Sequence, residues 1–434
     1  MQWDAERGAE RTKQRDRLLA QYVRHELAAY SSYWRREFMR RGVEPRSVRG
    51  LADLGQVEPL EWAAVAADPG AFLLRPDEGD IARHGDRRLV LAVTWAKLRR
   101  STDRLNREVV EPRYKPVHWH LDHGVPIGST ESDLDRLGQA GARIFSLAGL
   151  SRSDVLVGVG DDTEGLAWWQ VAHGARVAHL SAVHLGPAAD PELVAAARPT
   201  ALAGDRASLL GVLQRLAAAE VVLDDLHTVL VAGELPTAGQ RDELAAAAEA
   251  VAGRPEGVAV VVMWGPRGAR AMWGECREGS AFHTFPDMEI VEVDAGERRP
   301  REEGAGELLW SSLGWHGTAV FRVRTGVTAA VKDGRCKACG RTGPMVSVGE
   351  RPAAGLHTRV LAGHDEVSAF QVELRRVNGH EETIVFLALR PGADLGEVLS
   401  DLEGDLRATQ YVLLRKREVE AKVKEAGARV LDRR

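Results

Sequence analysis

Hydrophobic positions follow helical spacing in the first part of the chain. Between residues 9 and 41 apolar side chains, among them Leu19 and Val23, recur every three or four positions, which predicts helix. Short helices joined by loops are expected between residues 51 and 75. Residues 1–80 are therefore predicted to form a helical segment at the start of a larger domain.

Further along, short apolar runs alternate with longer helical repeats. Strands are predicted at 154–160, 175–180, 227–234 and 257–265. Helices are predicted at 163–173, 190–199, 207–220 and 238–253. This alternation is typical of βαβ units with a mainly parallel sheet flanked by helices. Ligands of such sheets bind at the carboxyl ends of the strands.

The pattern becomes rich in strands near its end. Strands are predicted at 288–294, 306–313, 317–325 and 327–334. After a boundary near 346–352, two strands around an Asn378-Gly379 turn are followed by a helix and another strand. The predicted fold class is α/β: a large N-terminal domain, whose sheet part covers 81–346, and a small α+β domain over 352–434.

Composition and charge narrow the classes of function. The chain has 434 residues, 44% of them hydrophobic, and a net charge of −5, which disfavours a nucleic-acid partner because such proteins carry a basic face. Its charged start lacks the apolar core of a signal peptide, and no apolar run is long enough to span a bilayer. We therefore expect a cytoplasmic protein with no membrane partner, whose three cysteines stay reduced.

Three cysteines and one histidine have the composition of a metal site. Cys336 and Cys339 form a C-x2-C pair, a spacing that lets both thiolates face one ion. Cys276 and His283 can supply two more ligands. A closed set of four ligands leaves no position for substrate, so the expected role is to hold a structural zinc. The alternative is three unrelated thiols.

Around these cysteines the sequence resembles the phenylacetate–CoA ligase branch of the adenylate-forming superfamily. The resemblance rests on "GEC" with "GSAFHTFPDMEIVEVD", on "GELLWSSL", "AVFRVRTG" and "CKACGRTGP", and extends to "YSSYWRREF" and the tail "EAGARVLDRR". It implies an adenylate-forming domain with a zinc knuckle over 81–346. It also supports the four zinc ligands, because matching residues hold zinc in some members of the branch. The implied activity joins a carboxylic acid to CoA through an acyl-adenylate, using ATP and Mg²⁺.

That chemistry requires a loop of small residues around the phosphates, a carboxylate for Mg²⁺, a carboxylate on the ribose and a lysine. Where the resemblance assigns the phosphate loop, the chain has "WHLDHG", Trp119 to Gly124. The next motif keeps Trp264 and Gly265 but has Gly268 in place of the Mg²⁺-binding glutamate. The nearest glycine-rich replacement, residues 265–274, contains two arginines that could meet an anion.

The remaining two devices also differ from the family. Arg324 and Gly326 are kept, but Val327 stands where the ribose-binding aspartate is expected. The tail lysine is replaced within Glu425-Ala426, although Lys422 and Lys424 lie close by. Glu234 resembles a residue that lines the nucleotide or acyl pocket, and is equally an ordinary residue at a strand end. The candidate pocket residues are Trp264, Gly265, Arg324, Gly326 and Glu234.

Two further groups of side chains have alternative interpretations. His118, His120, Asp122 and His123 could form a second metal or acid–base site, with His120 and His123 on one helix face, but a solvated loop is favoured. Trp168-Trp169 could line an acyl pocket, while packing against the sheet is favoured.

Two hypotheses follow from these observations. The first is a catalytically impaired or redirected relative that keeps the fold and zinc and acts as a binding or partner protein, for a protein or a small acyl group. The alternative is an active ATP-dependent carboxylic acid–CoA ligase, which would also require ATP, Mg²⁺ and CoA.

Overall fold

The computed structural model describes residues 8–160, 165–233, 235–253, 257–277, 281–295, 301–348, 361, 364–377, 380–405, 408, 410–426 and 430–433. The chain divides into two compact units. The first consists of Met1–Val291, Leu309–Thr325 and Val331–Ser347, and the second of Glu292–Leu308, Gly326–Ala330 and Val348–Arg434. Most of 346–352, the predicted boundary, lies outside the described residues, so that boundary stays a prediction.

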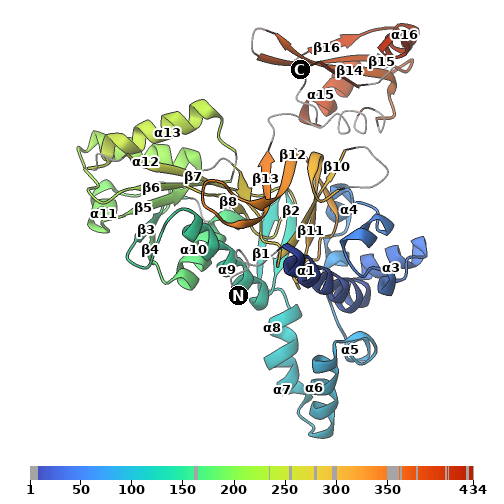
Figure 1. Cartoon of the computed structure of the whole chain (residues 1–434), viewed down its shortest axis with the longest axis vertical. Coiled ribbons are helices and arrows are strands. Elements are labelled where there is room, and N and C mark those ends of the chain that lie inside the picture. The colour runs from blue at the N-terminus through green and yellow to red at the C-terminus, as the bar shows by residue number, and fades with distance from the viewer. Residues whose placement is uncertain are drawn as a thin grey trace. The chain divides into compact units, whose positions relative to one another are not determined.

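Helices form the first part of unit one (Figure 1), as predicted for 9–41 and 51–75, and they continue through α5 to α8, which were not predicted. They are α1 (Gly8–Tyr22), a π-helical turn (Val23–Leu27), α2 (Ala28–Tyr30), α3 (Ser32–Arg41), α4 (Trp62–Ala67), α5 (Glu78–His84), α6 (Arg87–Leu98), α7 (Thr102–Leu105) and α8 (Glu111–Tyr114). The Ser31 side chain accepts a hydrogen bond from the Trp34 amide and so caps α3, which ends where Gly42 adopts a φ of 64°.

A β-hairpin follows α8 where a loop was expected. Strand β1 (His118–Asp122) pairs antiparallel with β2 (Val125–Ser129), and the turn uses His123 and Gly124, both with positive φ. Helix α9 (Glu131–Leu147) begins directly afterwards with a Thr130–Asp133 capping box. The expectation of a solvated loop or helix at His118–His123 was therefore wrong.

The largest sheet has eleven strands in the order β10-β11-β12-β13-β9-β8-β7-β6-β5-β3-β4. Its parallel part consists of β3 (Val155–Gly158), β4 (Ser181–His184), β5 (Ala201–Gly204), β6 (Thr228–Ala232) and β7 (Ala259–Trp264). The helices between these strands are α10 (Leu166–Ala178), α11 (Pro191–Ala196), α12 (Arg206–Ala218) and α13 (Ala238–Val251). The predicted α/β class is confirmed; the sheet is mixed, with a parallel part from β3 to β7 and antiparallel pairs from β7 through β8 and β9 to β13.

Two strand predictions in this sheet were wrong. Residues 175–180 continue α10 as far as Ala178, where His179 ends the helix with a φ of 57°. The runs 317–325 and 327–334 are not two strands, because β12 begins only at Val323 and continues to Arg335. The backbone before Val323 forms hydrogen bonds outside the sheet; for example, the Ala319 carbonyl accepts one from Trp34 Nε1.

The remaining strands complete this sheet, where β7, β8, β9 and β13 pair antiparallel in that order, or belong to the C-terminal region. They are β8 (Trp273–Glu275), β9 (Phe282–His283), β10 (Glu289–Asp294), β11 (Gly304–Ser312), β13 (Thr342–Val348), β14 (Val367–Val377), β15 (His380–Leu389), β16 (Gln410–Leu413) and β17 (Val430–Arg433). The last four form a sheet in the order β16-β15-β14-β17, with α15 (Leu395–Asp405) and α16 (Lys416–Ala426). The predicted hairpin turn at Asn378-Gly379 lies outside the described residues, although β14 and β15 pair antiparallel on either side of it.

Close packing of α9 against α10 depends on glycine. A Cβ on Gly141 would lie 2.4 Å from the Gln170 carbonyl oxygen and 2.8 Å from the Gly174 Cα. The two helix backbones can approach this closely only because neither position carries a side chain. None of the described helices is long and apolar enough to cross a membrane.

Candidate metal centre and candidate ligand site

Sheet register brings the four predicted metal ligands together. Cys276 directly follows β8, and His283 lies in β9, which pairs with both β8 and β13. Cys336 and Cys339 lie in the turn between β12 and β13, where the Cys336 amide donates to the Arg341 carbonyl. One ligand atom from each of the four residues lies within 4.8 Å of the others.

Two distances between these ligand atoms match the edges of a tetrahedral site. Cys276 Sγ is 3.9 Å from Cys336 Sγ, and Cys339 Sγ is 3.6 Å from His283 Nε2. With Zn–S bonds of about 2.3 Å and Zn–N bonds of about 2.05 Å, a tetrahedron has edges of about 3.8 Å between sulfurs and about 3.6 Å between sulfur and nitrogen. Three thiolates and an imidazole are also the donor set that zinc prefers.

The electrostatic environment suits this set of ligands. Burial lowers the pKa of His283 to about 4, so its imidazole is neutral and has a free lone pair at neutral pH. Burial, with Cys339 and Cys336 nearby, raises the pKa of the Cys276 thiol to about 12. Burial also opposes ionisation of Cys336, but backbone amides of Cys339 and Ala338 donate to its sulfur and lower its pKa. A bound cation would supply the charge that keeps all three sulfurs deprotonated.

The residues assigned to a nucleotide or acyl pocket have other contacts. Trp264 ends β7 and packs edge-on against Trp273, with ring centroids 5.8 Å apart, and Gly265 follows it. The Arg324 guanidinium lies 3.3 Å from the Glu61 carboxylate. Gly326 has a φ of 72°, and Glu234 lies outside the described residues. A ligand-binding role for these five residues stays a prediction.

A hydrogen bond connects the two stretches that replace the phosphate loop and the Mg²⁺ motif. The Gly268 amide donates to Asp122 Oδ2 at 2.7 Å. Gly268 itself has a φ of 81°, and a Cβ there would lie 3.0 Å from Val323 Cγ1 and 3.2 Å from the Trp62 ring. A glutamate at this position would be strained both by its backbone conformation and by its neighbours.

Strand β1 turns polar side chains inward, onto the face where β2 places the buried Val125 and Ile127. His118, His120 and Asp122 alternate along β1, and His120 is only 6% exposed. Trp119 and Leu121 point the other way and are 48% and 68% exposed. The helix face suggested for His120 and His123 does not exist. Among the residues that the structure describes, the group containing Cys276 is the one set of three or more potential ligands close enough for a metal.

Two tryptophans of α10 lie close to histidines. Trp168 and Trp169 are half-buried and contact each other edge-on, with ring centroids 4.8 Å apart. The Trp168 ring lies 5.2 Å from that of His184 in β4, and the Trp169 ring lies 4.1 Å from that of His118. The packing partners of Trp169 thus include the hairpin, which the sequence did not indicate. A role in acyl binding stays a prediction.

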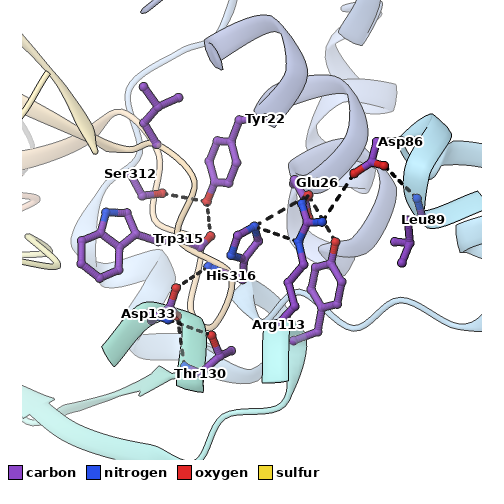
Figure 2. Close-up of polar contacts among 12 residues, drawn as sticks. Tyr22, Glu26, Asp86, Leu89, Arg113, Thr130, Asp133, Ser312, Trp315 and His316 are labelled. Atoms are coloured by element: carbon purple, nitrogen blue, oxygen red, sulfur yellow. Dashed lines mark hydrogen bonds and ion pairs between the residues drawn. The ribbon is translucent and has the colours of Figure 1, made fainter. Parts of the chain in front are cut away.

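Figure 2 shows a buried polar network beside the hairpin that sequence reasoning missed. Asp133 Oδ1 accepts a hydrogen bond from the His316 amide, and Oδ2 accepts from the Thr130 and Gly317 amides. On the other side of His316, the Glu26 carboxylate accepts a hydrogen bond from Arg113. The Thr130-x-x-Asp133 capping box was readable in the sequence, but its partners are up to 184 residues away.

No protein-family profile and no curated protein matches the chain. Solved structures of 2-hydroxyisobutyryl-CoA ligase do resemble it. The complex with 2-HIB-AMP and CoA in the thioesterification state is 16% identical, covers 100% of this chain and 91% of the ligase chain, and gives a TM-score of 0.62. An open conformation with the same two ligands covers 95% and 90% and gives a TM-score of 0.64 at 16% identity. The chain therefore has the fold of acyl-CoA ligases of the adenylate-forming superfamily, whereas the phenylacetate–CoA ligase branch stays a prediction.

Proposed function

We propose that this protein uses the fold of an acid–CoA ligase, in a form derived from the phenylacetate–CoA ligase branch, to bind an acyl ligand or a protein partner without forming acyl-adenylates. The observation that carries this proposal is the hydrogen bond from the Gly268 amide to Asp122. It occupies a backbone amide with a carboxylate at the position that the resemblance assigns to nucleotide phosphates and Mg²⁺.

Charge and shape at this position both disfavour a triphosphate. A phosphate cradle needs backbone amides that small residues leave accessible. The hairpin instead presents Trp119 and Leu121 on its outer face. The other oxygen of the Asp122 carboxylate, Oδ1, lies 2.6 Å from His123 Nδ1. Gly268 offers no carboxylate to Mg²⁺, and a glutamate at this position would be strained.

The Cys276, His283, Cys336 and Cys339 cluster is proposed to hold one structural zinc. Its role would be to fix the turn between β12 and β13 against β8 and β9. Reduced thiols are required for this site, which is in keeping with a cytoplasmic protein. No nucleic-acid partner is proposed, because the net charge of the chain is −5.

The test is acid-dependent ATP–pyrophosphate exchange with zinc-replete protein, Mg²⁺ and a panel of aromatic and aliphatic acids, together with a titration for ATP binding. We expect neither exchange nor ATP binding. Exchange that disappears in an Arg324→Gln variant would overturn the proposal, because it would assign turnover to this chain and to the predicted pocket.

The second candidate is an active acid–CoA ligase. It is favoured by the alignment of 100% of this chain with a ligase that was solved with an acyl-adenylate and CoA. Arg324 is also retained in that predicted pocket. The same exchange assay decides between the two candidates.

A further inference from the structure

A buried guanidinium beneath the β1–β2 hairpin has two unsatisfied N–H groups. Arg270 is 1% exposed, and its Nη2 donates to the Gly128 carbonyl at 2.9 Å and to Ser129 Oγ at 2.7 Å. Within the described part of the chain, its Nε and Nη1 have no hydrogen-bond partner. Leaving a buried donor unpaired costs roughly 1–3 kcal/mol, and more when the group is charged. Such a side chain indicates an acceptor that the protein itself does not supply.

Two imidazoles lie on the same side of the hairpin as this guanidinium. His118 is paired with Ser129 and His120 with Ile127, and directly opposed residues of an antiparallel pair share one face. Ser129 is also the residue whose hydroxyl Arg270 contacts. Neither His118 Nε2 nor His120 Nε2 has a partner among the described residues. Three side chains with unsatisfied nitrogens therefore gather on the inner face.

The electrostatics agree with this placement. Burial, together with the nearby Arg270 charge and His118, lowers the pKa of His120 to about 3. Burial and His173 lower the pKa of His118, and Arg270 again contributes. Both imidazoles are therefore neutral at pH 7, and each can donate one N–H from the tautomer that suits a ligand.

Aromatic side chains of α10 lie beside this cluster. The Trp169 ring is 4.1 Å from the His118 ring, and the His173 ring lies 5.8 Å beyond Trp169 in a stacked orientation. His173 Nε2 is a further buried nitrogen without a partner in the described chain. These rings exclude water from one side, so hydrogen bonds made within the cluster are stronger than in water.

The charge of the cluster limits the ligand to one negative charge. Arg270 is the permanently charged group, and its charge is partly balanced by Asp133, whose Oδ2 is 3.7 Å from Nη2, and by Asp122. A metal cation would be repelled by the guanidinium. A doubly charged phosphate would lack a second cation. A guanidinium edge instead matches the two oxygens of a planar anion.

We propose that Arg270, His118, His120 and Ser129 form a binding site for a planar monovalent oxyanion, either the carboxylate of a small organic acid or an inorganic ion such as nitrate or bicarbonate. Arg270 donates from Nε and Nη1, and the imidazoles donate from Nε2. The site goes beyond the proposed function, because it requires neither ATP nor CoA and stands whether or not the chain turns over ATP.

The test uses full-length, zinc-replete protein at pH 7 without nucleotide. Calorimetric titrations with acetate, benzoate, nitrate, bicarbonate and chloride at constant ionic strength are combined with ¹⁵N spectra of the histidine side chains. We expect saturable binding of oxyanions but not of chloride, with shifts at His118 and His120 and none at His25, whose ring contacts the His84 carbonyl. Binding of acetate and benzoate alone assigns an organic acid, and binding of nitrate or bicarbonate alone assigns an inorganic ion.

Two variants and one control test whether the anion binds at the proposed residues. His120→Phe should weaken binding about tenfold or more, the effect of losing one hydrogen bond to a charged group. Ser129→Ala removes one hydroxyl and should also weaken binding, and it gives a second test should His120→Phe not fold. The matched control His123→Asn changes an exposed residue at the turn of the same hairpin and should bind normally. The proposal is overturned by absence of saturable binding, by equal binding of chloride, or by unchanged binding in both variants.

Discussion

Replacing Glu26 by glutamine should remove a defined part of the pH dependence of stability. Glu26 is 5% exposed; its Oε1 accepts hydrogen bonds from Arg113 and from the Tyr114 hydroxyl, and its Oε2 has no partner among the described residues. Burial raises its pKa from 4.5 to about 7; Arg113 and Tyr114 oppose this shift, and Asp86 adds to it. The folded protein thus holds a proton that the unfolded chain releases.

The sign and size of the effect follow from this shift. Below pH 4.5 both states are protonated, so the stability associated with Glu26 is fully present. Between pH 4.5 and about 7 the unfolded state loses its proton first, and stability falls as pH rises. At 1.36 kcal/mol per pKa unit, the loss over this window is about 3 kcal/mol, after which the dependence is flat.

Urea denaturation of the wild-type protein and of Glu26→Gln between pH 4.5 and pH 8 measures the contribution of Glu26 to the free energy of unfolding. The free energy of unfolding of the wild type, minus that of the variant, should fall by about 3 kcal/mol across the window. Glu289 is also buried and its pKa is raised to about 7, but it titrates in both proteins and cancels in the difference. Parallel curves for the two proteins would refute the reasoning.

Three further predictions test other parts of the structure. Removing zinc with a chelator, or the substitution Cys339→Ser, should lower the free energy of unfolding by about 4 kcal/mol, the loop-closure value for the 60-residue separation of Cys276 and Cys336. Metal analysis should give one zinc per chain, and an unchanged melting temperature would contradict a structural role for the metal. In thermal denaturation, Gly141→Ala should destabilise the protein by about 3 kcal/mol because the added methyl group overpacks the contact between α9 and α10. The control Gly239→Ala on α13, where a Cβ would meet nothing within 4 Å, should be neutral or slightly stabilising. Equal effects of the two substitutions would contradict the close approach of α9 and α10. In urea denaturation, Asp122→Ala should lower the free energy of unfolding by roughly 1–3 kcal/mol, because it leaves the Gly268 amide unpaired. Asp122→Asn keeps an acceptor and should lower it less, and the reverse order would rule out the hydrogen bond.

The grouping of the four candidate metal ligands was predictable from the sequence, because cysteine is rare in this chain and a C-x2-C spacing, as in Cys336 and Cys339, lets two thiolates face one ion. The parallel sheet was accessible for the same kind of reason, since buried strands such as β6 and β7 are short continuous apolar runs. The C-x2-C pair and each apolar run are local patterns, whereas the meeting of that pair with Cys276, 60 residues away, depends on the pairing of the strands.

The β1–β2 hairpin was missed because its pattern is inverted. Along β1 the buried position is His120 and the exposed positions are Trp119 and Leu121, so the alternation of this five-residue stretch did not indicate which of its residues belong to the core. The 175–180 error has a similar origin, since β4 (Ser181–His184) has exposed and half-buried positions and was less apolar than the end of α10. The environment of Arg270 depends on Gly128, Ser129 and Asp133, more than 130 residues away, and no local pattern reports it.

The spacing of the four candidate zinc ligands has a consequence during synthesis. Cys276 and His283 leave the ribosome together, and Cys336 follows 60 residues after Cys276. Cys339 follows His283 by 56 residues, so at about 5–20 residues per second the nascent chain carries only two of the four ligands for about 3–11 s. During that interval β7 and β8 can already pair, while β9 lacks its β13 neighbour. The arrival of the second pair of thiols would thus time the closure of this part of the sheet.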